Sequence, residues 1–213
     1  MTTAKLLIVG ATGPTGREVL KEASLGGISV RSLARTPSAL DGVTGAGEVV
    51  QGDVLDPSSL VKASQGVDAI ICVLGARAGF GVTTLVSTGT ANLIEAAKTN
   101  SVKRLVVVTG MGAGDSRGHG GWLYDRILLP LLLRQLYADK DRQEALITDS
   151  GLDWTIVRPA FLTNGPRTST FKALDKLQPD TRLTKISRAD VAQYLVRATQ
   201  DTGAVHRVIH LTN

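Results

Sequence analysis

The chain has 213 residues, a net charge of +5 and 43% hydrophobic residues, which is typical of a globular protein with its own core. Cys72 is its only cysteine, which excludes an internal disulfide, and no apolar run reaches the ~20 residues of a membrane helix. The first residues lead straight into an apolar run without a secretory signal, so we expect a cytoplasmic protein. The basic residues are dispersed and accompany no groove-reading motif, so we expect neither a nucleic-acid nor a membrane partner.

The first predicted elements are a strand and a helix joined by a glycine turn. An apolar run over 6–9 predicts the strand, and an apolar-periodic segment over 18–25 predicts the helix. Glycines let the backbone turn sharply and approach a ligand closely, and the start of a helix presents free N–H groups to an anion. The turn therefore predicts a phosphate cradle built from Gly10, Thr12, Gly13, Pro14, Thr15 and Gly16. A strand-to-helix turn that binds no ligand is the alternative.

Strands and helices alternate along the rest of the chain. Apolar runs predict strands over 28–35, 48–51, 67–74, 104–108, 153–157 and 207–211, and helices are expected from Pro57, over 83–98 and from a capping box at Ser187. This alternation is typical of a doubly wound parallel sheet with helices on both faces. We therefore predict an α/β fold with a single Rossmann-type domain over residues 1–213.

One segment, 160–186, breaks the alternation and is rich in Thr, Lys, Pro and Gly. It follows the carboxyl end of a predicted strand, where sheets of this kind bind their ligands. We interpret it as a substrate-side insertion in the domain, with a short hairpin between 168–171 and 182–186. A plain long loop is the alternative.

The end of the second predicted strand indicates which dinucleotide the cradle holds. An acidic residue there binds the 2′-hydroxyl of NAD, whereas an arginine accommodates the 2′-phosphate of NADP. Arg35 stands at this strand end, which has no acidic residue, and Arg17 or Thr36 could assist it. A guanidinium offers a two-donor fork to a phosphate, so we predict NADP(H) as the cofactor. A solvated Arg35 is the alternative.

Several motifs resemble those of the atypical short-chain dehydrogenase/reductase (SDR) family, especially its NmrA-like members and its small flavin or biliverdin-IXβ reductases. The resemblance extends along nearly the whole chain and is carried by Gly-Ala-Thr-Gly-x-Thr-Gly, by Gly-Asp-Val after the third strand, and by Ser-Gly-Leu-Asp-Trp-Thr-Ile-Val-Arg-Pro at the sixth. It implies that Asp53 and Val54 contact the adenine. It also implies that Leu74, Gly75 and Ala76 pack on the adenosine half, and that Pro159, Ala160 and Phe161 line the nicotinamide pocket.

The catalytic residues of ordinary SDR enzymes are only partly matched. Those enzymes use a serine and Tyr-x-x-x-Lys, in which the lysine charge lowers the pKa of the tyrosine and the lysine holds the ribose. Lys140 has the matching place, but Tyr137 is three residues from it, and Thr109 stands where the serine is expected. Residues three apart share a helix face, so Tyr137, Lys140 and Thr109 are our catalytic candidates. Polar residues on a helix surface are the alternative.

A second glycine-rich run, 110–121, follows the fifth predicted strand. We interpret it as a flexible lid, with His119 as a candidate general acid and Asp115 or Arg117 as substrate contacts. An exposed loop histidine is the alternative. The apolar run 127–133 around Pro130 is expected to be core, a lid underside or an oligomer interface. The three histidines lack ligand spacing, so we expect no metal.

These motifs together predict an NADPH-dependent oxidoreductase that reduces a flavin, quinone or similar conjugated small molecule, acting as a monomer or homodimer. Small flavin reductases also lack the full catalytic triad, because the cofactor carries the chemistry and the protein supplies orientation. The alternative is a non-catalytic NADP(H) sensor of the NmrA-like type. The displaced pair of Tyr137 and Lys140 is the feature that points toward the sensor.

Overall fold

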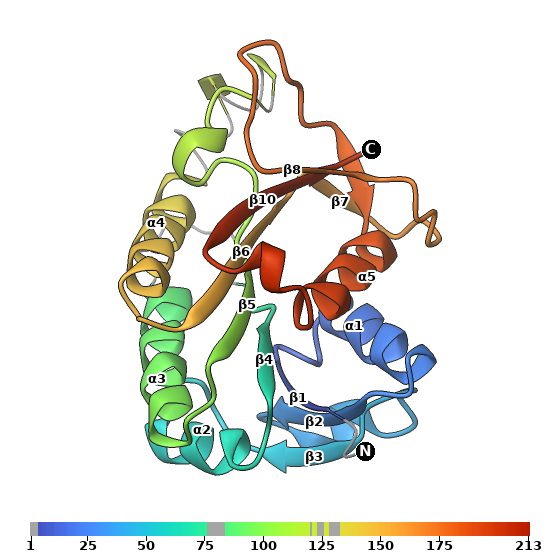
Figure 1. Cartoon of the computed structure of the whole chain (residues 1–213), viewed down its shortest axis with the longest axis vertical. Coiled ribbons are helices and arrows are strands. Elements are labelled where there is room, and N and C mark those ends of the chain that lie inside the picture. The colour runs from blue at the N-terminus through green and yellow to red at the C-terminus, as the bar shows by residue number, and fades with distance from the viewer. Residues whose placement is uncertain (1–3, 76–83, 120, 123–125, 128–132) are drawn as a thin grey trace.

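An eight-stranded sheet forms the centre of the fold in this computed structural model, which describes residues 4–75, 84–119, 121–122, 126–127 and 133–213 (Figure 1). The strand order is β3-β2-β1-β4-β5-β6-β10-β8. Its members are β1 (Lys5–Val9), β2 (Ser29–Ala34), β3 (Glu48–Gln51), β4 (Ala69–Cys72), β5 (Arg104–Val108), β6 (Asp153–Pro159), β8 (Lys172–Leu174) and β10 (Arg207–Thr212). Neighbouring strands are parallel except β8, which is antiparallel to β10. The predicted Rossmann-type α/β fold is confirmed.

Helices cover both faces of this sheet (Figure 1). One face carries α1 (Pro14–Leu25) and α5 (Arg188–Ala198), and the other carries α2 (Pro57–Ser64), α3 (Leu85–Thr99) and α4 (Arg134–Thr148). Side chains alternate along a strand, so Leu6 and Ile8 pack in the cluster of α1 and α5, whereas Leu7 and Val9 pack in the cluster of α2, α3 and α4. Burial on both faces explains why the strands are continuous apolar runs.

The strand order reverses between β1 and β4. From β1 the chain passes through α1 to β2 and β3, and from β3 it returns through α2 to β4 on the other side of β1. The loops that follow β1 and β4 therefore diverge and leave a crevice at the carboxyl ends, where open α/β sheets bind ligands. The turn over 10–16 lies at this crevice.

The predicted hairpin in 160–186 is wrong. β7 (Phe161–Thr163) pairs in parallel with β9 (Lys185–Ser187) in a separate small sheet, and β8 joins the main sheet beside β10. β10 would otherwise present an unpaired edge, and β8 satisfies its backbone groups. The stretch 168–171 forms no strand and is bonded to Asp190, whereas 182–186 leads into β9, so the two stretches do not pair.

Two element boundaries also differ from the sequence prediction. The first helix begins at Pro14 rather than at residue 18, because proline is favoured at the first helical position, where no N–H is needed. The fourth strand ends at Cys72, which leaves Val73 and Leu74 to line the crevice. Burial raises the pKa of the Cys72 thiol to about 11, so this cysteine is an unreactive part of the core.

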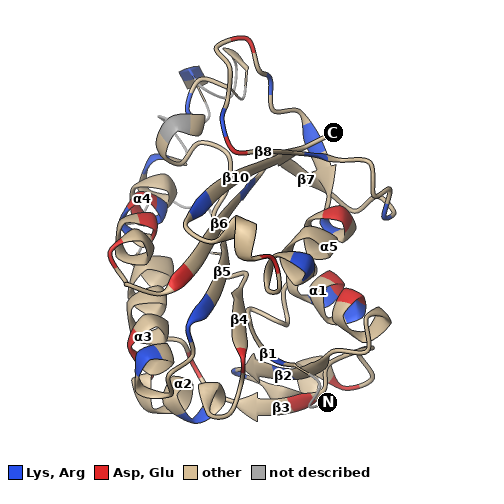
Figure 2. Cartoon of the chain, viewed as in Figure 1, with Lys and Arg blue, Asp and Glu red and all other residues tan. Residues whose placement is uncertain are grey.

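Charged side chains of both signs are interspersed along the helices (Figure 2). Lys or Arg stands with Asp or Glu on each of α1, α3, α4 and α5. Within the described ranges, no helix is long and apolar enough to cross a membrane.

Asp190 anchors the segment after β7 to α5. Its carboxylate is fully buried and accepts hydrogen bonds from the backbone amides of Thr168 (2.7 Å) and Ser169 (2.8 Å) and from the hydroxyls of Thr168 (2.9 Å) and Ser187 (2.8 Å). The Asp190 amide donates to Ser187 Oγ at 3.0 Å, so Ser187 caps α5 as the first half of the predicted capping box requires, while the Asp190 carboxylate accepts from the Ser187 hydroxyl. Burial by itself raises the pKa of this carboxyl, but the hydrogen bonds outweigh it and leave the pKa lowered.

We expect Asp190→Ala to lower the free energy of unfolding by about 2–4 kcal/mol, since hydrogen bonds to a charged group contribute roughly 1.5–3 kcal/mol each. Urea denaturation measures this loss. Asp201→Ala is the matched control, because the Asp201 carboxylate accepts a single capping hydrogen bond, from the Gly203 amide of the short helix η4 (Thr202–Ala204), and removing such a cap costs about 1 kcal/mol. Equal losses in the two variants would show that Asp190 acts only as a helix cap.

The difference in stability between the wild type and Asp190→Ala should depend on pH. A carboxyl with a lowered folded-state pKa stabilises the protein above the ordinary pKa of aspartate and loses that contribution as pH falls. The stability difference between the wild type and Asp190→Ala should therefore shrink in acid.

Candidate functional site

The glycine turn brings the start of α1 close to the sheet. Gly10 has a φ of +88°, and a Cβ at this position would lie 2.8 Å from the carbonyl oxygen of Val73. A Cβ on Gly16 would lie 2.2 Å from the carbonyl oxygen of Gly10. Both positions therefore require glycine, one for the turn and one for close packing of helix on strand.

The first turn of α1 supplies amide donors at the crevice. The Gly13 amide donates to the Gly10 carbonyl at 3.1 Å, and the Arg17 amide makes the first intrahelical bond, to the Gly13 carbonyl at 2.9 Å. The amides of Thr15 and Gly16 precede this bond in the helix, so helix geometry leaves them available to an anion. The turn thus has the form of the predicted phosphate cradle.

A pocket of about 180 Å³ lies beside the turn, at the carboxyl ends of β1 to β4. Its lining includes eight of the predicted cofactor-binding residues: Gly10, Thr12, Gly13, Arg35, Asp53, Val54, Leu74 and Gly75. Among the described residues, Leu33, Ala34, Gly52, Val73 and Leu85 also line it. Pro14, Thr15 and Gly16 lie in the first turn of α1, and Ala76 lies outside the described residues.

Arg35 is the guanidinium available at the end of β2. It follows the strand directly, its side chain is exposed, and it lines the pocket. Arg17 is engaged elsewhere, because it donates to the carbonyl oxygens of Thr12 (3.2 Å) and Ala39 (2.7 Å) and so ties the glycine turn to the segment after β2. Thr36 stands at the N-cap position of the short helix η1 (Pro37–Leu40), but its side chain makes no capping hydrogen bond.

Asp53 is held in a fixed turn at the end of β3. Its Oδ1 accepts from the Leu55 amide at 3.0 Å, and its own amide donates to Ser59 Oγ at 3.1 Å. A carboxylate has two oxygens, so this turn does not use its whole acceptor capacity. The geometry is therefore compatible both with an aspartate that only stabilises the turn and with the adenine contact that the resemblance implies.

A second hollow, of about 340 Å³, lies at the carboxyl ends of β5 and β6. It brings together Thr109 and Tyr137 with the predicted nicotinamide-side residues Pro159, Ala160 and Phe161. Gly110, Met111, Leu162 and Arg188 are the other described residues of its lining.

Tyr137 and Lys140 are buried on one face of α4. A Cβ built on Gly110 would lie 3.6 Å from Tyr137 Oη and 3.9 Å from Lys140 Nζ, so both polar ends reach the same point beside the second hollow. Lys140 Nζ donates to the carbonyl oxygen of Thr109. Burial lowers the pKa of the Lys140 ammonium to about 8, and the nearby Glu144 carboxylate opposes this shift.

A buried ion pair that was not predicted from the sequence lies beside these residues. Glu144 Oε1 accepts from the Thr109 hydroxyl at 2.6 Å and from Arg158 Nε at 3.0 Å, and its Oε2 accepts from an Arg158 amino group at 2.6 Å. The Thr109 hydroxyl therefore donates to Glu144, while its carbonyl accepts from Lys140. The available signal was spacing, because residues 137, 140 and 144 recur at helical intervals.

The same helix also contacts α3 through buried polar residues that the sequence analysis missed. The Asp139 carboxylate accepts from the backbone amides of Val86 (3.0 Å) and Ser87 (3.3 Å), at the start of α3. Gln143 Nε2 donates to Thr90 Oγ1 at 2.9 Å. The position of α4, and thus of Tyr137 and Lys140, is therefore set by hydrogen bonds as well as by packing.

The loop over 110–121 is bonded to its surroundings. Arg117 donates to the Gly112 carbonyl at 3.1 Å and forms an ion pair with Asp141 of α4. His119 Nδ1 lies 2.8 Å from the Thr181 carbonyl oxygen, in the segment after β8. Arg117 and His119, which we considered for substrate contact and acid catalysis, thus contact other parts of the chain, and their predicted roles and the lid remain predictions.

Some interpretations fall outside what the structure describes. The Asp115 side chain, and residues 128–132 of the apolar run around Pro130, lie outside the described part of the chain. Among the described residues, no three His, Cys, Asp or Glu side chains lie together where they could hold a metal ion.

Comparison with known proteins identifies the class. Residues 10–202 match the family described as NAD(P)H-binding, and the chain belongs to this family. It is 30% identical to the uncharacterized sugar epimerase YhfK of Bacillus subtilis over 98% of this chain and 94% of that protein. It is 27% identical to the sanguinarine reductase of Eschscholzia californica, covering 92% of this chain and 84% of that protein.

A solved structure gives the same result. The crystal structure of the oxidoreductase ylbE from Lactococcus lactis has a TM-score of 0.83 to this chain at 25% identity, covering 98% of this chain and 90% of that one. The SDR-type resemblance and the NAD(P)H cofactor class are thereby confirmed. The choice between NADP(H) and NAD(H) remains a prediction.

A substitution at Gly13 tests the predicted phosphate cradle, because a side chain at this position causes little backbone strain. It has φ −74° and ψ 163°, which any residue adopts, and an added Cβ would lie 3.3 Å from the Gly10 carbonyl oxygen. We expect Gly13→Val to fold but to bind NADPH at least ~10-fold more weakly, a loss of about 1.4 kcal/mol, because the branched side chain enters the pocket.

Gly26→Val, at the far end of the same helix, is the matched control and should bind NADPH normally. Fluorescence titration measures affinity, and thermal unfolding confirms that both variants fold. Unchanged affinity in a folded Gly13→Val protein would refute the cradle.

Proposed function

We propose that this protein is an NADPH-dependent oxidoreductase that reduces a flavin, a quinone or a similar conjugated small molecule. The observation that carries the proposal is the placement of two hollows along one edge of the sheet. The first hollow is the pocket beside the glycine turn, and it combines that turn with Arg35. The second hollow combines the buried Tyr137–Lys140 pair with Gly110. This edge is where sheets of this topology bind ligands.

The residues present fit a dinucleotide, because glycines 10 and 16 leave no room for a side chain in the cradle. The amides of Thr15 and Gly16 would bind the pyrophosphate, Arg35 the 2′-phosphate, and Asp53 the adenine. When bound, a reduced nicotinamide supplies the hydride, and the protein contributes binding and orientation.

Reduction of the acceptor requires a proton as well as a hydride, and residues of the second hollow would supply this proton. The Tyr137 hydroxyl would donate it to the reduced acceptor, and the Lys140 charge close by would lower the pKa of that hydroxyl. Thr109 would take part by positioning, because its carbonyl receives Lys140 and its hydroxyl is bonded to Glu144. Reductase activity in a relative, the sanguinarine reductase, supports this class of reaction.

One observation favours the alternative, a non-catalytic NADP(H) sensor. Thr109 stands at the place of the family serine, but its hydroxyl donates to Glu144 and therefore does not donate to a substrate oxygen. Tyr137 also differs from the family tyrosine by one position on the helix, about 100° of rotation. A sensor would bind NADPH without consuming it.

The test is NADPH oxidation against a panel of flavins, quinones and aldehydes. We expect turnover with at least one conjugated acceptor. Tight NADPH binding without oxidation across the panel would overturn the proposal in favour of the sensor. An epimerase, the activity in the name of YhfK, returns its hydride to the substrate and would likewise show no net oxidation.

We expect Arg35→Ala to weaken NADPH about ten- to a hundredfold and to leave NADH nearly unchanged. A hydrogen bond to a charged group contributes roughly 1.5–3 kcal/mol, which corresponds to this change in affinity. Arg17→Ala is the control, since Arg17 supports the glycine turn and its loss should weaken both cofactors alike. Equal weakening of both cofactors in Arg35→Ala would indicate a structural role for Arg35.

We expect kcat/KM to fall as the pH rises through about 8. The pKa of Lys140 is lowered to about 8, so the ammonium is charged below that pH and loses its charge above it. Lys140→Arg stays charged and should abolish this fall, because arginine does not deprotonate in this range. An unchanged pH profile in an active, folded Lys140→Arg variant would exclude Lys140 as the titrating group.

A further inference from the structure

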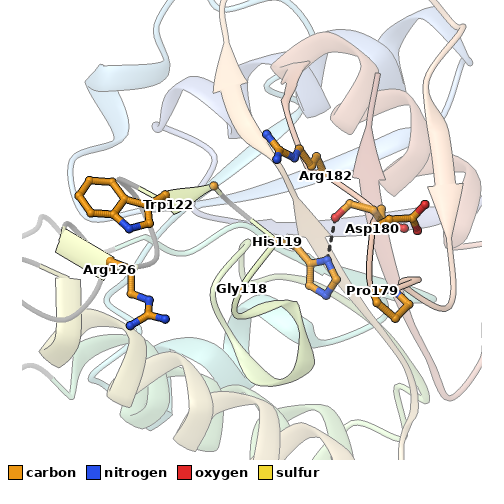
Figure 3. Close-up of a pocket in the computed structure, with 9 residues that line it drawn as sticks. Gly118, His119, Trp122, Arg126, Pro179, Asp180 and Arg182 are labelled. Atoms are coloured by element: carbon orange, nitrogen blue, oxygen red, sulfur yellow. Dashed lines mark hydrogen bonds between the residues drawn. The ribbon is translucent and has the colours of Figure 1, made fainter.

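A third pocket lies between the loop after β5 and the segment after β8. Its volume is about 530 Å³, and its lining is Gly118, His119, Gly121, Trp122, Arg126, Pro179, Asp180, Thr181 and Arg182. Figure 3 shows Trp122 and Arg126 on one side, Pro179, Asp180 and Arg182 on the other, and His119 between them. The volume lies within the ~300–1,000 Å³ that is typical of small-molecule sites.

Hydrogen bonds join the two walls of this pocket. His119 Nδ1 lies 2.8 Å from the Thr181 carbonyl oxygen, as the dashed line in Figure 3 marks. The Leu183 amide donates to the His119 carbonyl at 3.0 Å. The pocket is therefore closed at its base by contacts between segments more than 60 residues apart in the chain.

Trp122 leaves a large aromatic surface at the pocket. Its side chain is 73% exposed, whereas the other tryptophan, Trp154, is partly buried against the core. Indole rings bind planar partners by stacking, and an exposed aromatic beside a concave surface is typical of a binding site. The lining thus offers contact to a flat, conjugated molecule.

The charges of the pocket indicate an anion. Arg126 and Arg182 contribute two guanidinium groups, and Asp180 is the one acidic residue among the described residues of the lining. Among the described residues, neither arginine has an ion-pair or hydrogen-bond partner, whereas Arg158 of the ion pair described above is matched to a carboxylate. Guanidinium forks match the geometry of carboxylate and phosphate groups.

We propose that this pocket binds the anionic end of an aromatic substrate. Arg126 and Arg182 bind its carboxylate or phosphate, and Trp122 packs against its ring system. The proposal rests on the proposed reductase function, because the loop after β5 and the stretch 160–186, which together form this pocket, also contribute Gly110 and Ala160 to the second hollow. A substrate of this class thus combines a reducible conjugated ring with an acidic group.

Matched ligand pairs test this proposal at equilibrium, in the presence of NADP⁺ and without turnover. FMN and riboflavin share a ring and differ by a phosphate, and a carboxylated quinone and its hydroxymethyl analogue differ by a carboxylate. We expect the anionic member of at least one pair to bind ~10-fold or more tightly, which corresponds to one charge-assisted hydrogen bond. The pair that shows the preference distinguishes a phosphate from a carboxylate ligand.

Arg126→Ala and Arg182→Ala should each remove most of this preference and leave the neutral ligands within about twofold. Trp122→Ala should weaken both members of a pair alike. Arg167→Ala is the control, because Arg167 lies in the same segment but pairs with Glu22 outside the pocket. Arg167→Ala should leave the affinity for both members of each pair unchanged.

The outcomes separate this proposal from the proposed function. Equal affinity for anionic and neutral members of both pairs, or arginine variants that weaken both members alike, would overturn the subsite. An anion preference that depends on Arg126 and Arg182 without any NADPH oxidation would keep the subsite and refute the reductase. Turnover of neutral acceptors without an anion preference would support the reductase and refute the subsite.

Discussion

The close approach of α1 to the sheet at the glycine turn is the constraint on which the ligand-binding edge depends. Any side chain on Gly16 would collide with the Gly10 carbonyl, and any side chain on Gly10 would collide with Val73 of the loop after β4. Without this contact the first amides of α1 would move away from the crevice, and the ends of β1 and β4 would separate. Two missing Cβ atoms thus connect the packing of the core to the chemistry of its edge.

The buried polar face of α4 has a corresponding role at the other end of the crevice. Removing charges from water is costly, and Glu144 and Arg158 recover this cost only through good geometry and additional hydrogen bonds. Here the additional partner is Thr109, whose carbonyl receives Lys140. The ion pair therefore connects β5, β6 and α4 at the point where Tyr137 and Lys140 emerge. We infer that it is retained for position more than for stability.

Beyond the carboxyl ends of β5 and β6, the chain is mostly in loops rather than in helices or strands of the main sheet. The loop over 110–121 and the segment over 160–186 each contact both the second hollow and the third pocket. They are joined through His119 and Thr181 and anchored through Asp190 and Asp141. A rigid sheet that presents variable loops at one edge is a common way for one fold to accept different substrates. We therefore expect the class of substrate to be decided in these loops and the class of cofactor at β1 to β3.

The sequence by itself determined the parts of this protein that depend on local patterns. Alternating strands and helices indicated the α/β fold, the glycine spacing indicated the turn at Gly10, and the Ser187 capping box marked the start of α5, because each pattern acts within a few residues. The tertiary structure decided what depends on contacts between distant residues. Examples are the pairing of β7 with β9, the engagement of Arg17 with Ala39, and the ion pair between Glu144 and Arg158. No local periodicity encodes these contacts, because whether a polar side chain meets solvent, a ligand or a buried partner is set only when separate elements pack together.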